Sequence, residues 1–323
     1  MSPASRLHRS VCLVVLHWMI VQPALSQCDR WQQRIKCGLS IELDVETHRF
    51  TGTEKLVYQN NSPDTLYQLF FHLYFNAFKP GSEMDVRSRT ITDPDQRVMD
   101  RILTLAPAEQ GDLHCSAMFQ DGKPVRLEEL GTILRVVLAK PVLPKKSTTV
   151  MFEFNGQVPV QIRRSGRDSQ EGIAYSMTQW FPKVAAYDHE GWHPDPYVGR
   201  EFYGEWGDYD VRLALDSSYT VAASGALENA ASIGHGYAAL TKPQKRTDGK
   251  LEWHFIAKDV HDFGWSADPD YTHLTAQVPG GPLLHFIYED KGESSPIWKE
   301  LPAYMVKHFQ YMATRFGAYP YPH

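Results

Sequence analysis

The sequence predicts a mainly β protein, a twisted sandwich of large sheets followed by the start of an α/β unit. First, apolar and polar residues alternate, as at Ile41, Leu43 and Val45 between acidic neighbours, which is typical of strands with one buried face. Second, no long helical pattern occurs from Ile41 to about Tyr271. Third, an apolar strand and then helical spacing follow that stretch.

The β part contains several such segments. The alternation recurs at Val211, Leu213 and Leu215, and again at Trp253 and Phe255. An Asn-Asn-Ser-Pro-Asp run at residues 60–64 is a strong turn signal between two apolar segments. The segments expected as further strands are 55–58, 66–74, 133–138, 148–154 and 220–224.

The character of the sequence changes near Tyr271. Residues 283–288 form an apolar strand, and Ser294 with Pro296 offers a helix start. Helical spacing then runs to Gly317 through Leu301, Tyr304, Met305, His308, Phe309, Met312 and Phe316. One strand and one helix leave an apolar face uncovered, so we expect an α/β domain that is incomplete at His323. Alternatively, the helix docks on the β domain as a terminal element.

Composition excludes some classes of partner. The 323 residues suffice for about two domains, and 22% of them are charged with a formal net charge of −5. No block of Lys and Arg alternates with aromatic residues. We therefore expect no nucleic-acid partner and no binding to anionic membranes.

Residues 1–26 are typical of a secretory signal peptide. Arg6 and Arg9 precede an apolar stretch at 11–25, and Ala24-Leu25-Ser26 fits a small-x-small cleavage site. The alternative is a membrane anchor, but polar residues and a proline interrupt the stretch, which is short for a span. No later segment is long and apolar enough for one. We expect an exported protein, periplasmic or extracellular, without a membrane span after cleavage.

The cysteines allow at most one internal disulfide in the mature chain. Cys28, Cys37 and Cys115 remain after the leader. Cys28–Cys37 is the plausible pair in an oxidising compartment, and three free thiols are the alternative. No Cys-x-x-Cys pair suggests a metal or redox site.

The sequence His189-Glu190-Gly191-Trp192-His193 matches the HExxH pattern of zinc peptidases. That chemistry needs a helix, which places both histidines on one face beside a general base. Gly191 within the motif and Pro194 directly after it oppose a helix. We interpret the match as a loop coincidence; a true zinc site there is a weaker hypothesis.

Other motifs also have simpler explanations. Residues 234–239 loosely match a dinucleotide fingerprint, but no βαβ unit surrounds them, so a hairpin turn is expected. Residues 93–95 are expected to form a surface turn rather than a metal site. Residues 175–209 mix aromatic and charged residues, which fits either the wall of a recognition site or a cluster that packs a loop on a sheet.

Six segments in order resemble one family. They are YQNNSPDTL at 58–66, HLYFNAF at 72–78, MTQWFPK at 177–183, GWHPDPY at 191–197, GEWGDYDV at 204–211 and VHDFGWSA at 260–267. The series resembles the N-terminal region of bacterial secreted members of the aminopeptidase N-type zinc metallopeptidases. It covers nearly the whole mature chain, and its order and spacing are more specific than any one motif.

The resemblance implies a saddle-like β-sandwich domain at 27–273 and the truncated start of a thermolysin-like catalytic domain at 274–323. The family removes N-terminal residues from peptide substrates with zinc. Its helical HExxH, exopeptidase motif and catalytic Tyr belong to the catalytic domain and do not occur in this sequence. We therefore expect no catalytic residue and no metal ligand here: zinc belongs to the full-length parent, and this chain is inactive alone.

One functional position is carried over from the family. Its β domain contributes a Gln that helps to hold the free amine of the substrate, and Thr178-Gln179 resembles that position. The residues after it differ from the family pattern, so Gln179 can equally be a polar residue at a strand end. The competing function is a secreted, non-catalytic β-rich binding module. The sequence leaves the oligomeric state open.

Overall fold

The computed structural model describes residues 31–92, 94–199, 202–239 and 243–322. The predicted signal peptide and Cys28 lie outside these residues. From Gln33 onward the chain forms one compact unit. Among the described residues, no helix combines the length and the apolar character needed to cross a membrane.

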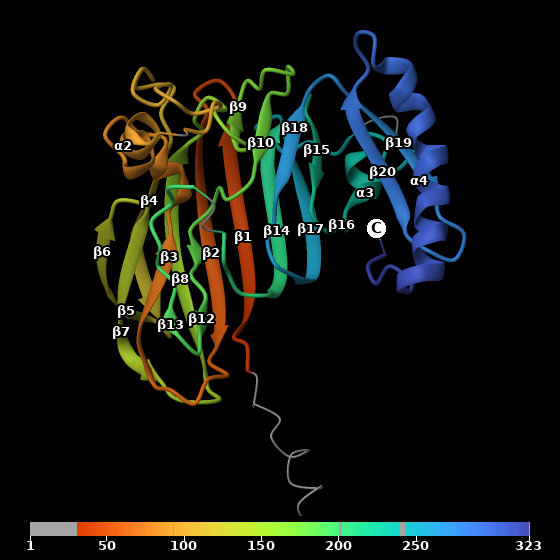
Figure 1. Cartoon of the computed structure of the whole chain (residues 1–323). Helices are drawn as coiled ribbons and strands as arrows, with labels where there is room; N and C mark the ends of the chain where they lie inside the picture. Colours follow the sequence, from red (N-terminus) through yellow and green to blue (C-terminus); the bar gives the residue numbers. More distant parts are fainter. Residues whose placement is uncertain (1–30, 93, 200–201, 240–242, 323) are drawn as a thin grey trace, which may run out of the picture. The chain divides into compact units, whose positions relative to one another are not determined.

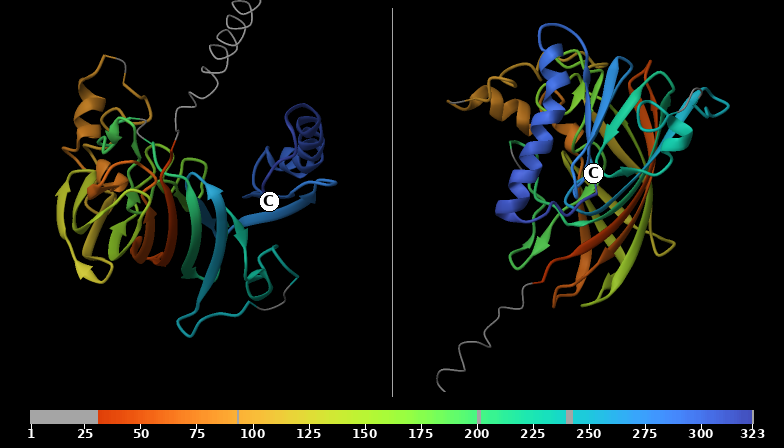
Figure 2. Two further views of the ribbon diagram at one scale, coloured as in Figure 1. Left: turned by 90° about the horizontal axis from the view of Figure 1, so that it is seen from below. Right: turned by 90° about the vertical axis from the view of Figure 1, so that its right-hand side faces the viewer.

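An eight-stranded sheet is the largest element of the fold (Figure 1). Its strands, in spatial order, are β16 (Ala226–Leu227), β17 (Lys250–Val260), β14 (Gly207–Asp216), β1 (Arg34–Asp44), β2 (Arg49–Gln59), β8 (Ser147–Gln157), β4 (Asp112–Gln120) and β5 (Lys123–Pro124). Strand β1 pairs antiparallel with β2 and parallel with β14, so that Ile41 lies between Gly52 and Leu213. Figure 2 shows the curvature of this sheet.

Two smaller sheets supply the second layer. One has the order β11 (Lys183–Val184), β3 (Leu66–His72), β7 (Ile133–Val142) and β6 (Arg126–Leu130); the other has β15 (Thr220–Ala223), β18 (Trp265–Asp268), β10 (Tyr175–Met177) and β9 (Gly166–Arg167). The short elements are the 3-10 helix η2 (Tyr74–Ala77), the helices α2 (Glu83–Thr90) and α3 (Ala230–Ile233), and the hairpin β12 (Tyr187–Asp188) with β13 (Gly191–Trp192).

The alternation read from the sequence places the core. In β1, Ile35, Cys37, Leu39, Ile41 and Leu43 are buried while their neighbours face outward. The buried face meets the second layer through aromatic pairs, for example Phe71 of β3 and Phe152 of β8, whose ring centroids are 5.5 Å apart. This confirms the mainly β sandwich. Val45 differs from the expectation, because it lies in the turn that follows β1.

Space for the large rings comes from two glycines of the sheet. A Cβ on Gly52 would lie 2.5 Å from Ile41 Cδ1, and one on Gly156 would lie 2.3 Å from Phe50 Cζ. Both distances are below van der Waals contact, so a side chain at either position would displace the core.

The last part of the chain has its own apolar cluster. Strands β19 (Tyr271–Gln277) and β20 (Leu283–Glu289) form a two-stranded antiparallel sheet, and helix α4 (Ser295–Phe316) packs on it. Leu301, Met305 and Phe309 of α4 contact a cluster around Leu284 and Phe286. The predicted strand and helix are confirmed, and the helix packs on its own sheet. The expected boundary at 273/274 falls inside β19.

Candidate functional site

Gln179 follows β10 in a tight turn. Its φ is 51°, in the left-handed region that non-glycine residues rarely occupy. The next residue, Trp180, is fully buried and donates from Nε1 to the carbonyl oxygen of Phe263 at 3.0 Å. The anchored indole holds the turn, so Gln179 keeps its unusual backbone conformation at the edge of the core.

The side chain of Gln179 contacts Asp262. Its Nε2 donates to Asp262 Oδ2 at 3.3 Å. A carboxylate only accepts hydrogen bonds, so the amide nitrogen must face Asp262 and Oε1 must point away from it. The half-buried amide therefore presents an acceptor oxygen, as recognition of an ammonium group requires.

Lys183 completes this group, which we call the Gln179 cluster (Gln179, Lys183 and Asp262). Its Nζ lies 3.2 Å from Asp262 Oδ2 and donates to the carbonyl oxygen of His261 at 2.9 Å. The Lys183 side chain is 2% exposed, and burial lowers its pKa, opposed by Asp262. The cluster holds a carboxylate and an amide oxygen but no nucleophile beside a base, so it suits binding rather than catalysis.

A groove borders the cluster. His261, next to Asp262, lines a cavity of about 640 Å³ together with Trp206, Tyr319 and Tyr321. Tyr321 donates from its hydroxyl to the carbonyl oxygen of Asp259 at 2.7 Å. The groove thus lies between the large sheet and the residues after α4.

The HExxH match lies on a hairpin and not on a helix, which agrees with its interpretation as a loop coincidence. Gly191 and Trp192 form β13, which pairs with β12. His193 Nε2 lies 2.8 Å from Asp188 Oδ1, and Tyr203 donates to the other oxygen of that carboxylate at 3.0 Å. The His189 side chain is 82% exposed. The two histidines therefore do not share a helical face, and His193 is engaged with Asp188.

The described residues do not fit a zinc site. Among them, the one group with metal-ligand spacing is Asp268, Asp270 and Glu289. It offers carboxylates alone, whereas zinc sites are built around histidine or cysteine, with carboxylates as additional ligands. The ammonium group of Lys291 lies 2.7 Å from Asp270 and 3.5 Å from Glu289, so a cation of this chain already pairs with two of the three carboxylates.

The aromatic region 175–209 is mostly packing. Trp180, Phe181, Tyr197 and Tyr209 are buried, in agreement with the packing alternative. Glu205, in the same region, is 7% exposed and accepts from the backbone N–H of Tyr187 at 2.7 Å. Burial raises its pKa from 4.5 to about 7. The sequence gives no signal that this carboxyl group is buried.

A histidine pair lies beside the glycine-rich segment 234–239. His273 Nδ1 lies 3.1 Å from the carbonyl oxygen of His235, so it carries the proton, and Nε2 then accepts from His285 Nδ1 at 2.8 Å. The Tyr237 ring lies 4.4 Å from that of His273. The segment is a turn after α3, in line with the sequence interpretation, and it packs against β19.

Asn60 and Cys37 have purely structural roles. Asn60 is fully buried, and its side chain donates to backbone oxygens of Asp64 and Val142, so it serves the turn that the sequence predicts. Cys37 is a free, buried thiol whose Sγ lies 3.4 Å from Glu54 Oε1. At Cys37 the structure therefore agrees with the alternative in which the thiol is free. Cys28 lies outside the described residues.

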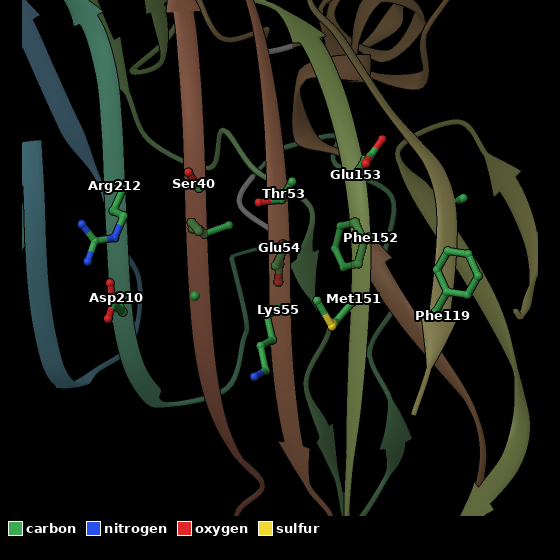
Figure 3. Close-up of a pocket in the computed structure, with 13 residues that line it drawn as sticks. Ser40, Thr53, Glu54, Lys55, Phe119, Met151, Phe152, Glu153, Asp210 and Arg212 are labelled. Carbon is green, nitrogen blue, oxygen red and sulfur yellow. The ribbon is translucent and has the colours of Figure 1, made fainter. Parts of the chain in front are cut away.

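The open face of the large sheet carries a shallow hollow of about 450 Å³ (Figure 3). Phe119 of β4 and Met151 of β8 are 41% and 52% exposed there. Lys55, Asp210 and Arg212 extend from neighbouring strands. This mixed surface is the face of the sheet that the second layer does not cover.

The fold is similar to solved structures of M1 zinc metallopeptidases. A mutant of the M1 zinc metallopeptidase from Deinococcus radiodurans matches with a TM-score of 0.52 and 15% identity, over 92% of this chain and 56% of that chain. The mutant bound to a Tyr-Ser-Ala substrate gives 0.53 and 16% over the same shares. A two-domain M1 zinc metallopeptidase mutant bound to L-arginine gives 0.52 and 15%, over 90% and 54%.

These likenesses show the fold. No family model and no curated protein sequence matches the chain. The chain spans little more than half the length of the structures that it matches. The predicted fold class is confirmed: the chain is mainly β, with several sheets arranged as in M1 zinc metallopeptidases.

Proposed function

We propose that this chain is the N-terminal part of an exported, zinc-dependent metallopeptidase of the aminopeptidase type, related to the bacterial secreted members of that family. The observation that carries the proposal is the likeness of fold to M1 zinc metallopeptidases over 92% of the chain. The parent protein removes N-terminal residues from peptides. This chain forms one wall of its substrate groove and is inactive alone.

Gln179 binds substrate in this proposal. Its amide nitrogen is held by Asp262, so Oε1 is left to accept a hydrogen bond from the free amine of a peptide. The anchored turn at Trp180 supports this role, because a fixed acceptor loses little entropy on binding.

Zinc belongs to the parent and not to this chain. The single acidic group with ligand spacing among the described residues offers carboxylates alone and pairs with Lys291, and His193 is engaged with Asp188. The zinc ligands and the exopeptidase motif are supplied by sequence that this chain does not contain.

Extending the reading frame tests the proposal. The protein encoded by the sequence continued beyond the His323 codon should release free amino acids from unblocked peptides and leave N-acetylated peptides intact. The present chain, purified alone, should do neither. A stop codon at that position, or an extended protein without peptidase activity, would favour the binding module.

Two variants of the extended protein test Gln179. Gln179→Ala should raise KM for unblocked peptides roughly tenfold, because one charge-assisted hydrogen bond to the amine of the peptide is lost. The control is Gln59→Ala, because Gln59 is an exposed glutamine at the end of β2. If both variants keep the KM of the parent, Gln179 does not bind the amine.

The second candidate function is a secreted binding module without catalysis. The hollow on the open sheet face favours it, because exposed Phe119 and Met151 lie there among charged side chains. Capture of a ligand by the isolated chain, lost in Met151→Lys and kept in Leu143→Lys, would support this function. Leu143 is a suitable control because it is equally exposed and does not line the hollow.

A further inference from the structure

We propose that a cavity beside α2 binds a tetrahedral dianion, the phosphate or sulfate group of a small molecule. The cavity has a volume of about 390 Å³ and is lined by Arg87 of α2, by Arg97 and by Arg163, together with Ser88. Three guanidinium groups around one cavity suit an oxyanion, because each offers planar, paired donors. The site is independent of the proposed peptidase function.

Arg163 is the clearest sign of a missing partner. Its side chain is 5% exposed. Its two hydrogen bonds both start at Nη1 and end at the Tyr197 hydroxyl and the Gly199 carbonyl oxygen. Its Nε is buried and makes no hydrogen bond. A buried donor without an acceptor is costly, and more so on a charged group, so an oxyanion in the cavity would stabilise this arrangement.

The neighbouring carboxylate does not fill that role. Asp95 Oδ2 lies 3.6 Å from Arg163 Nε, which is outside hydrogen-bond range. Asp95 is instead paired with Arg97, whose Nε and Nη2 donate to its two oxygens at 2.9 and 2.7 Å. This pairing lowers the pKa of Asp95 to about 2. The carboxylate is therefore ionised and turned toward Arg97.

The charge balance favours a dianion. Arg87, Arg97 and Arg163 carry three positive charges and Asp95 carries one negative charge, which leaves two positive charges among the described lining residues. Arg87 forms no ion pair within the described part of the chain. A carboxylate ligand would neutralise half of this charge, whereas a phosphate or sulfate group neutralises all of it and accepts from several donors at once.

Calorimetric titration of the full chain with inorganic phosphate and with sulfate, at fixed ionic strength, tests the site. We expect saturable one-to-one binding. Arg87→Gln should weaken it roughly tenfold, because one charge-assisted contact is lost and the exposed position does not affect folding. Arg126→Gln is the control: Arg126 is exposed on β6 and lies outside the cavity lining. Arg163→Lys should weaken binding further.

Three results of the titration would overturn the proposal: no saturation, equal weakening by Arg126→Gln, or unchanged binding in Arg87→Gln.

A pH series tests the charge of the ligand. The dianion of a phosphate ester takes up one proton at about pH 6, and that of inorganic phosphate does so slightly above it, whereas sulfate stays a dianion. Phosphate should therefore bind more weakly at about pH 5.5 than at about pH 8, and sulfate should bind equally. Phosphate binding that is equally tight at both values would contradict a dianion site.

Discussion

Lys183 and Asp262 form an ion pair in which one partner is far more buried than the other. Nζ lies 3.2 Å from Oδ2, the Lys183 side chain is 2% exposed, and that of Asp262 is 24% exposed. The charge of Lys183 therefore depends on its partner for stabilisation more than the charge of Asp262 does. Without its partner, Asp262 can still be hydrated, whereas Lys183 cannot.

This asymmetry predicts different costs for the two single changes. Asp262→Asn leaves a buried, uncompensated ammonium group and should lower the free energy of unfolding by about 3 kcal/mol at neutral pH. Lys183→Met replaces the buried stem with an apolar one and should cost clearly less. Urea denaturation of both variants measures the difference. Equal losses would show that the pair acts mainly through packing.

A second prediction concerns Glu205. Burial raises the pKa of its carboxyl group from 4.5 to about 7, so the folded state favours the protonated form. The resulting stability is complete below about pH 4.5 and is lost as the pH rises to about 7. The increase in the pKa of Glu205 corresponds to a change in the free energy of unfolding of about 3 kcal/mol.

Glu205→Gln keeps the acceptor for the Tyr187 N–H and removes the titration. Relative to the unmodified chain, this variant should gain about 3 kcal/mol between about pH 4.5 and pH 7.5. Denaturation at a series of pH values measures the gain. Glu153→Gln is the control, since Glu153 is exposed on β8. Parallel pH curves for the Glu205→Gln variant and the unmodified chain would mean that the pKa of Glu205 is the same in the folded and unfolded states.

Gln179 should respond differently to asparagine and to alanine. Its φ of 51° lies where asparagine is tolerated better than other non-glycine residues. Gln179→Asn should therefore leave the stability unchanged or slightly higher, although the shorter side chain no longer reaches Asp262. Gln179→Ala keeps the strain and loses the hydrogen bond, at a cost of about 1 kcal/mol. Thermal unfolding compares them, and an equally large loss in both would assign Gln179 to structure alone.

The sequence predicted the parts of the fold that depend on local pattern. Strict alternation identified β14 and β17 because one face of each strand is buried, and the period of 3.6 identified α4 because one stripe packs on β19 and β20. It could not predict that β1 pairs with β14 in parallel, since the register Ile35↔Gly207 joins residues far apart in the chain.

The candidate site was predictable only in part. Gln179 was predicted as a substrate-binding residue from the resemblance at Thr178-Gln179, and its contact with Asp262 depends on how two distant loops meet. The same holds for Arg163, whose burial follows from the packing of Tyr197 and Gly199 around it. A polar residue gains an unusual role through tertiary contacts, and these leave no periodic signal in the sequence.

The histidine pair predicts acid sensitivity at the junction between the turn 234–238 and the sheet β19–β20. His273 uses both ring nitrogens as a neutral imidazole, donating to the His235 carbonyl and accepting from His285. Burial lowers its pKa below 6.5, so the unfolded state takes up the proton first. Stability is therefore complete above about pH 6.5 and declines below it. The protection factors of the β19 and β20 amides, which correct for the intrinsic pH dependence of exchange, should be lower at about pH 5 than at neutral pH. They should fall less in His273→Gln, which cannot be protonated. A loss of protection confined to other strands would place the acid-labile step elsewhere.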